Sequence, residues 1–290
     1  MRKFLEVVAP DICRNVDTII DDDRKRIPRV NSIPLAYLNL VLQSAFIPDT
    51  KIISTFLISN AGLGKSTHLS YLKKFDFVEY VMDMTPKYLA DFLEEVSRQK
   101  KKFLVLPDFI ACLGHNQRTV DLSRSIFRGM MEEGIEKIAI YGMNKDFGHT
   151  VNAGLISGIT TSKIDENTAR WKSDGFYSRL LPFSYSHSLA TQDIVMDNFF
   201  TNTNPIDYVD MDIIKDCKTP RRSELIDMQI QLLAKGIAEP YVGAVYRPYN
   251  LIVALCNSSA VLRHSDKIED VDVKLVSNLC GFINRKQNPI

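Results

Sequence analysis

The feature that most constrains this chain of 290 residues is a short segment with two glycines, residues 59–67, between an apolar run and an amphipathic one. The segment, here called the glycine loop, reads Ser-Asn-Ala-Gly-Leu-Gly-Lys-Ser-Thr. Residues 52–58 before it are apolar and rich in β-branched side chains, which predicts a buried strand, and the pattern HLSYLKKF after it predicts a helix. A simple glycine turn between strand and helix is one interpretation, and a phosphate-binding loop is the other.

The residue types favour a phosphate-binding loop. The pattern G-x-x-x-x-G-K-[ST] is met except that Ser59 stands where the first glycine is usual. Gly62 and Gly64 can adopt backbone angles closed to other residues, so that N–H groups, with the positive end of the following helix, can surround phosphate oxygens. We expect Lys65 to reach the β- and γ-phosphates of ATP and Ser66 to bind Mg²⁺. The expected nucleotide-binding residues are Asn60, Ala61, Gly62, Leu63, Gly64, Lys65, Ser66 and Thr67.

Predicted strands and helices alternate through the first two thirds of the chain. Apolar runs predict strands at residues 77–82, 103–107, 136–141 and 153–160, and helical spacing predicts helices at 34–47, 86–98 and 119–133. Thr85 is the expected N-cap of the helix at 86–98, with Pro86 in its first turn. This alternation predicts an α/β fold, a three-layer parallel sheet covered by helices. We expect an arm at residues 1–29, a core at 30–205 and a smaller helical domain at 206–290.

A carboxylate at the end of a neighbouring strand is expected beside a site for Mg²⁺ and ATP. Asp108 follows the apolar run of residues 103–107. We expect it to serve the metal, although it could instead align with a catalytic glutamate or cap the next turn. Two successive acidic residues are usual, and only one is present here. Asp121, Glu132 and Glu133 are possible substitutes.

Residues 61–67 resemble the phosphate loops of AAA+ ATPases, and three later segments are similar to the minichromosome maintenance group of AAA+ helicases. The first segment, residues 123–161, is similar to a helix, a strand, an inserted hairpin and a sensor strand, whose last residue would be Thr160 or Thr161. The second, residues 175–182, resembles the segment that supplies an arginine finger, here Arg179. The third begins with Tyr246-Arg247-Pro248 and is similar to a lid helix whose arginine contacts the γ-phosphate.

The resemblance implies an AAA+ core with a C-terminal helical lid, in which Thr161, Arg179 and Arg247 join Lys65 and Asp108 in catalysis. It also implies a homo-oligomer, a hexameric ring, that acts on DNA in replication, and short proteins of this kind look like ATPases of mobile elements. Each arginine has a simpler interpretation: Arg179 as a surface residue paired with a carboxylate, and Arg247 as a surface charge at the start of a helix. Lys145, in the predicted hairpin, is either a contact to the DNA backbone or an ordinary exposed lysine.

Composition sets further limits. The net charge of +1 gives no sign of a general affinity for nucleic acid, so DNA would have to bind through local basic patches. The five cysteines form no CxxC pair, and Cys112, Cys256 and Cys280 lie in apolar stretches, which predicts core thiols in a reducing, cytoplasmic setting without disulfides or zinc. No uncharged apolar run reaches the roughly 20 residues that span a bilayer.

Two functions remain open. The chain could be a motor that couples ATP hydrolysis between subunits to movement along DNA. Alternatively, it could be a helicase loader or adaptor that uses ATP binding as an assembly switch with little or no hydrolysis, which the single carboxylate at residue 108 favours.

Overall fold

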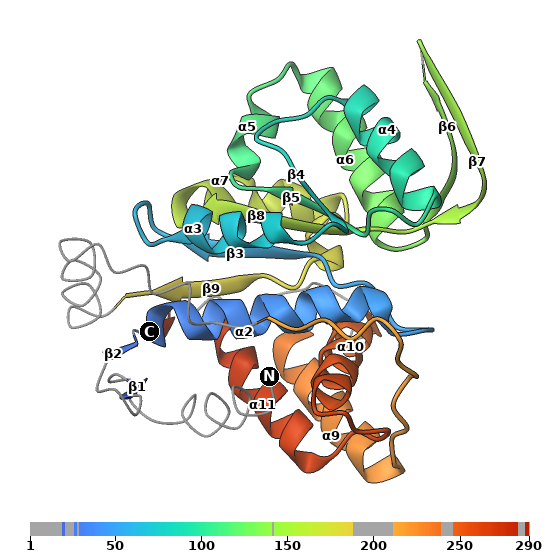
Figure 1. The fold of residues 1–290 in the computed structure, drawn as a ribbon. Helices are drawn as coiled ribbons and strands as arrows, with labels where there is room; N and C mark the ends of the chain where they lie inside the picture. Colours follow the sequence, from blue (N-terminus) through green and yellow to red (C-terminus); the bar gives the residue numbers. More distant parts are fainter. Residues whose placement is uncertain are drawn as a thin grey trace.

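The computed structural model describes residues 19–20, 26–27, 29–140, 142–187, 211–238, 246–283 and 288–289 (Figure 1). At its centre is a sheet of parallel strands in the order β10-β9-β3-β8-β5-β4. The strands are β3 (Thr55–Ser59), β4 (Val78–Tyr80), β5 (Phe103–Leu106), β8 (Gly154–Thr160), β9 (Phe183–Ser186) and β10 (Asn288–Pro289). The α/β class predicted from the sequence is confirmed.

The inner strands are mostly apolar because helices cover both faces of the sheet. Every residue of β3 and β5 is buried, as is most of β8. A strand that is buried on both faces has no solvent side on which polar residues could alternate. For this reason the strands predicted at 52–58, 103–107 and 153–160 were recognisable, and each is confirmed within a few residues.

The helices pack in two layers, each with its own hydrophobic cluster. One layer covers one face with α4 (Pro86–Ser97), α5 (Phe109–Leu113), α6 (Gln117–Met131) and α7 (Thr161–Ser173). The opposite face carries α2 (Arg29–Gln43), which continues into the 3-10 turn η1 (Ser44–Phe46). The Thr85 hydroxyl accepts a hydrogen bond from the Tyr88 N–H at the start of α4, as its expected role as an N-cap requires.

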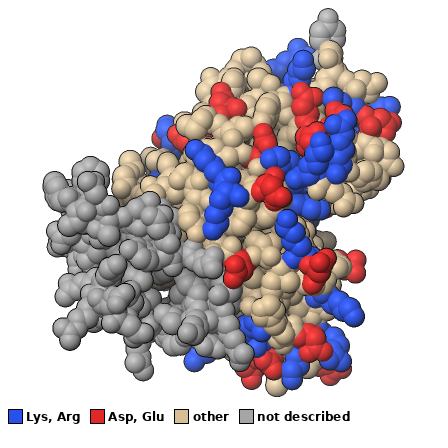
Figure 2. All heavy atoms as spheres, viewed as in Figure 1, with Lys and Arg blue, Asp and Glu red and all other residues tan. Residues whose placement is uncertain are grey.

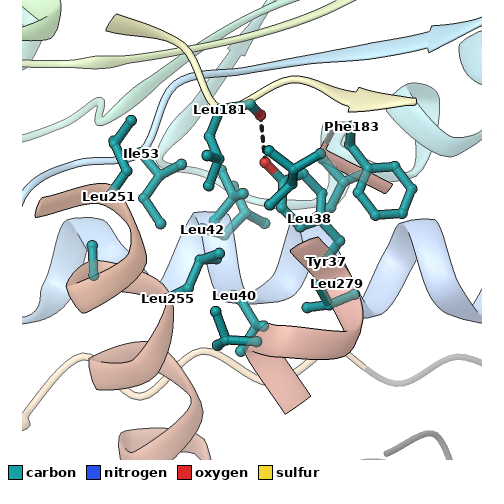
Figure 3. Close-up of a cluster of buried hydrophobic side chains, with 14 of the residues drawn as sticks. Tyr37, Leu38, Leu40, Leu42, Ile53, Leu181, Phe183, Leu251, Leu255 and Leu279 are labelled. Carbon is teal, nitrogen blue, oxygen red and sulfur yellow. Dashed lines mark hydrogen bonds between the residues drawn. The ribbon is translucent and has the colours of Figure 1, made fainter. Parts of the chain in front are cut away.

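Three C-terminal helices lie beneath α2, as predicted for a helical segment, and share its core. They are α9 (Glu224–Ala238), α10 (Tyr246–Leu262) and α11 (Asp270–Ile283). Figure 3 shows leucines of α2, α10 and α11 packed against Leu181 and Phe183. The ring of Phe282 stacks on that of Phe183 with 5.1 Å between centroids, so the helices are tied directly to β9.

One predicted strand is misplaced. Residues 136–141 were expected to extend the parallel sheet, but β6 (Ile135–Ile140) pairs only with β7 (Met143–Val151) as an antiparallel hairpin outside it. The physical reason is polarity: Glu136 and Lys137 are exposed, and a strand with such residues cannot be buried on both faces. The hairpin expected from residue 142 onward therefore uses the predicted strand as its first arm. Strand β9 was not predicted.

The three cysteines predicted as core residues, Cys112, Cys256 and Cys280, are buried and free. Among the described residues, no helix is both long and apolar enough to cross a membrane. Cys13, most of the predicted arm at residues 1–29 and the proposed boundary at 205/206 lie outside the described part of the chain. The two-stranded pairing of β1 (Ile19–Ile20) with β2 (Arg26–Ile27) and the turns η2 (Tyr71–Lys74) and η3 (Tyr177–Arg179) complete the description.

Candidate functional site

The glycine loop lies at the carboxyl edge of the sheet, where the strand order reverses. It joins β3 to α3 (Lys65–Ser70), and the chain then runs to β4 at the far edge of the sheet. The connection after β8 runs the other way, past β3, to β9. In open α/β sheets, the crevice between strands whose connections leave in opposite directions is where ligands bind. Ser59 pairs with Thr160 across this crevice, so both strand ends meet at the loop.

The loop has the backbone shape that its glycines predict. Gly62 and Gly64 have φ angles of 81° and 77°, in the region that favours glycine. A Cβ built on Gly62 would meet nothing within 4 Å, so glycine is required there by backbone angle rather than by crowding. Asn60 and Ala61 are exposed and Leu63 is half-buried. The loop is open to solvent on the side where a phosphate would approach.

Ser59 does not need to be glycine in this structure. It is the last residue of β3, it is buried, and its backbone is extended. Its hydroxyl oxygen lies 3.1 Å from the Nζ atom of Lys65 and accepts a hydrogen bond from it. The departure from the usual pattern therefore leaves the turn at Gly62 and Gly64 intact and adds a side-chain contact to the lysine.

Lys65 lies across the mouth of the loop. Its Nζ donates to the carbonyl oxygens of Ser59 at 2.8 Å and Asn60 at 2.7 Å. Burial lowers the pKa of Lys65, and the charge of Asp108 acts in the opposite direction. A lysine ammonium has three N–H donors. The Lys65 ammonium could therefore donate hydrogen bonds to phosphate oxygens that enter the loop. Ser66 and Thr67, in the first turn of α3, are exposed.

Of the three roles expected for Asp108, the structure shows the cap, and it adds an electrostatic effect on Lys65. Asp108 follows β5 at the carboxyl edge, where its electrostatic effect reaches Lys65. Its Oδ1 also accepts a hydrogen bond from the Ile110 N–H at 3.0 Å and caps α5. Ser66 and Asp108 are the residues that could hold Mg²⁺, with water or phosphate oxygens as the remaining ligands. In the part of the chain that the structure describes, no group of three or more His, Cys, Asp or Glu side chains could hold a metal ion.

The possible substitutes for a second carboxylate have other partners. Asp121 pairs with Arg124 and, at 3.0 Å, with Arg170. Glu132 and Glu133 both pair with Arg179. Asp108 is therefore the carboxylate that the structure places at the end of a strand beside Lys65.

The predicted sensor residues lie at the junction of β8 and α7. Thr160 ends β8 directly opposite Ser59, and Thr161 is the first residue of α7. Both are half-buried. The Thr160 hydroxyl lies 3.4 Å from that of Ser162. Of the two threonines, Thr160 is the one paired with Ser59, the last residue of β3 before the glycine loop turns.

Arg179 and Arg247 lie together at the opposite, amino edge of the sheet. Leu180, beside Arg179, bridges to Ser54 just before β3, whereas the glycine loop begins at Ser59 at the other end of that strand. Five residues of extended chain separate the two edges by about 16 Å. Neither arginine therefore reaches the glycine loop of its own chain in this arrangement.

Glu132 joins the two arginines. Its carboxylate pairs with the Nε of Arg179 at 2.7 Å and with the Nε of Arg247 at 2.6 Å, and Arg247 also donates to the Ser178 hydroxyl at 2.9 Å. Glu133 pairs with the outer nitrogen of Arg179 at 2.9 Å. Glu132, Arg179 and Arg247, with Lys51 and Ser178, line part of a cavity of about 40 Å³. Burial lowers the pKa of Lys51, and the charges of Glu132 and Glu133 act in the opposite direction.

Lys145 is held by acidic residues of α4. Its Nζ lies 3.1 Å from a carboxylate oxygen of Asp91 and also pairs with Glu94. These contacts raise the pKa of Lys145 and lower that of Glu94. On the face shown in Figure 2, basic and acidic side chains intermingle over the upper part of the molecule rather than forming one basic surface. The structure thus gives Lys145 protein partners.

Two residues near the loop were missed from the sequence. Tyr185 of β9 donates a hydrogen bond to the Leu63 carbonyl at 3.0 Å, and its hydroxyl lies 3.3 Å from Nδ1 of the buried His68. No sequence pattern pointed to Tyr185, because its strand was not predicted. For His68 the one signal was its position three residues after Lys65. No known family model and no curated protein matches this chain.

Proposed function

We propose that the chain is an AAA+-type ATPase that binds Mg²⁺ and ATP at the glycine loop and acts as a homo-oligomer on DNA. The observation that carries the proposal is the position of a loop with two glycines at positive φ, followed by Lys65, at the reversal point of a parallel sheet. The resemblance to minichromosome maintenance helicases supports DNA as the partner.

The residues of the loop fit a triphosphate. The positive φ angles of Gly62 and Gly64 turn the loop so that its N–H groups can converge on one point, and Lys65 supplies donors at its mouth. Ser66 and Asp108 would hold Mg²⁺, which neutralises charge on the phosphates when it is bound. Since α3 has only six residues, the loop amides and Lys65 do more of this binding than the helix dipole.

The two arginines support an oligomer. Arg179 and Arg247 lie at the amino edge, about 16 Å along the sheet from their own loop. A head-to-tail contact that presents this edge to the glycine loop of a neighbour would complete each site with the neighbour's arginines, and closed repetition of such a contact gives a ring. A hexamer is the size that the resemblance implies. A fixed guanidinium charge suits phosphate charge that develops during transfer.

The second candidate is an assembly switch, a loader or adaptor that binds ATP and turns it over slowly. Asp108 favours this function because it is a single carboxylate already engaged as the cap of α5. The pairing of Lys145 with Asp91 and Glu94 also leaves the hairpin without a free basic side chain at that position. A motor and a switch share the same nucleotide site and differ in turnover.

The test begins with ATP binding in the presence of Mg²⁺, measured by calorimetry. The wild-type chain should bind, and Lys65→Ala should not, because the variant loses the donors that Lys65 places at the loop. Lys235→Ala, on the exposed side of α9, is the control and should bind like wild type. Failure of the wild-type chain to bind ATP would refute the proposal. Strong stimulation of hydrolysis by DNA would favour the motor, and slow turnover with ATP-dependent oligomers would favour the switch.

A further inference from the structure

Tyr185 is a buried tyrosine whose hydroxyl supports the glycine loop from below. It lies in β9, next to β3, and has no exposed surface. Its Oη donates a hydrogen bond to the carbonyl oxygen of Leu63, 122 residues earlier in the chain, at 3.0 Å. A buried hydroxyl is normally satisfied by some partner, so the bond alone does not indicate a role. The choice of partner does, because Leu63 lies between the two glycines that shape the loop.

His68 completes the arrangement. Its Nδ1 lies 3.3 Å from the Tyr185 hydroxyl, and its ring lies under Gly64, where a Cβ would come within 3.6 Å of it. A hydroxyl has one proton, which Tyr185 gives to Leu63, so the tautomer of His68 that carries its proton on Nδ1 is the one that can donate to the Tyr185 oxygen.

The peptide between Leu63 and Gly64 is the element that these contacts fix. A peptide group is planar and trans, so its C=O and N–H point in opposite directions. When the Leu63 carbonyl points to the buried Tyr185, the Gly64 N–H points away from Tyr185, toward the open side of the loop. A loop without this bond could turn the same peptide over and offer an oxygen, which repels phosphate, in place of a donor.

We propose that Tyr185 is a positioning residue that orients the Leu63–Gly64 peptide, with His68 holding its hydroxyl, so that the Gly64 N–H is available to a phosphate. The inference rests on the proposed function, because it concerns how the same loop binds ATP. It adds a residue from the far side of β3, which no pattern in the loop itself would reveal.

Tyr37 offers a matched control. It is equally buried, stacks on Phe183, and donates to the Leu181 carbonyl at 2.6 Å, as Figure 3 shows. It lies in α2 and has no contact with the glycine loop. Tyr185→Phe and Tyr37→Phe each remove one buried hydroxyl and keep the ring, so they should reduce the melting temperature similarly, while only the first changes the loop.

The experiment measures ATP affinity with Mg²⁺ and the amide spectrum of ¹⁵N-glycine-labelled protein. Tyr185→Phe should weaken ATP binding about five- to tenfold, the usual effect of losing one hydrogen bond, and Tyr37→Phe should change it less than about twofold. In wild type and Tyr37→Phe the Gly64 amide resonance should move on addition of ATP, and in Tyr185→Phe that shift should shrink. A general loss of packing would not selectively reduce the ATP-induced shift of the Gly64 amide.

A second pair of variants tests the same peptide without touching Tyr185. His68→Asn keeps an N–H near the position of Nδ1, whereas His68→Leu removes it, so ATP should bind more tightly to the asparagine variant. If wild type binds ATP and Tyr185→Phe binds as tightly as Tyr37→Phe, the inference is wrong and the proposed function stands. If wild type binds no ATP, the proposed function itself fails.

Discussion

Replacing Arg179 with alanine should stop ATP turnover and leave ATP binding intact. Arg179 is almost buried, held by Glu132, Glu133 and the Gly175 carbonyl, at the edge of the sheet opposite the glycine loop. If it acts, it acts on a neighbouring subunit. Under the proposed function, the variant would therefore separate ATP binding, which is assigned to one chain, from hydrolysis, which is assigned to a pair of chains.

The separation of the two edges sets the magnitudes. Two unit charges about 16 Å apart in water interact by only about 0.3 kcal/mol. Loss of Arg179 should thus change the affinity of its own chain for ATP by no more than about threefold. An arginine that stabilises phosphate transfer contributes about 10³ to 10⁵ in kcat, so turnover should fall at least a thousandfold.

The assay combines calorimetry with steady-state hydrolysis, and it includes mixed oligomers. Lys65→Ala is expected not to bind ATP but keeps Arg179, and Arg179→Ala keeps its glycine loop. In an equal mixture, about one interface in four joins an intact loop to an intact arginine, since each interface is head-to-tail. Hydrolysis should therefore recover to about a quarter of the wild-type rate. Arg128→Ala, which removes a half-buried arginine bonded to the Asp174 carbonyl, is the control and should hydrolyse normally.

Three results would refute this reasoning. Arg179→Ala could lose ATP binding, which would mean that the arginine serves its own loop. The mixture could show no recovery although both variants fold and associate, which would exclude a site shared between chains. Arg179→Ala could also hydrolyse ATP like wild type, which would leave Arg179 as a structural partner of Glu132 and Glu133.

Two predictions concern stability. Burial lowers the pKa of His68 from its ordinary 6.5 to about 3, so below pH 6.5 the unfolded chain binds a proton that the folded chain refuses. The free energy of unfolding should then fall as the pH falls from about 6.5 toward 3, by up to about 1.4 kcal/mol per pH unit. Urea titrations at several pH values should show a weaker dependence of this free energy on pH for His68→Asn than for wild type. Asp272 is fully buried and accepts from Ser259 and from two nitrogens of Arg263. Asp272→Asn should cost about 3 kcal/mol in the same titration and the exposed Asp266→Asn less than about 1 kcal/mol; equal costs would show that the buried pair is not stabilising.

The sequence by itself determined the elements whose signals are local. β3, β5 and β8 are mostly apolar because they are buried on both faces. The glycine loop is recognisable because its turn needs glycine at positions 62 and 64. Thr85 and Pro86 fixed the start of α4 for the same reason: an N-cap acts on N–H groups two or three residues away. For Asp108 the sequence left a metal ligand, a catalytic carboxylate and a cap as alternatives; the structure shows the cap and adds an electrostatic effect on Lys65.

Only the tertiary structure decided the contacts that join distant segments. The meeting of Arg179 and Arg247 at Glu132, and the bond from Tyr185 to Leu63, depend on which strands are neighbours and on their register. Strand β6 had a strand's pattern, but its place outside the sheet was set by what the sheet could bury on both faces. Local propensity acts over a few residues, whereas packing depends on how much surface whole elements bury against one another. The packing of distant segments therefore cannot be predicted from local propensity.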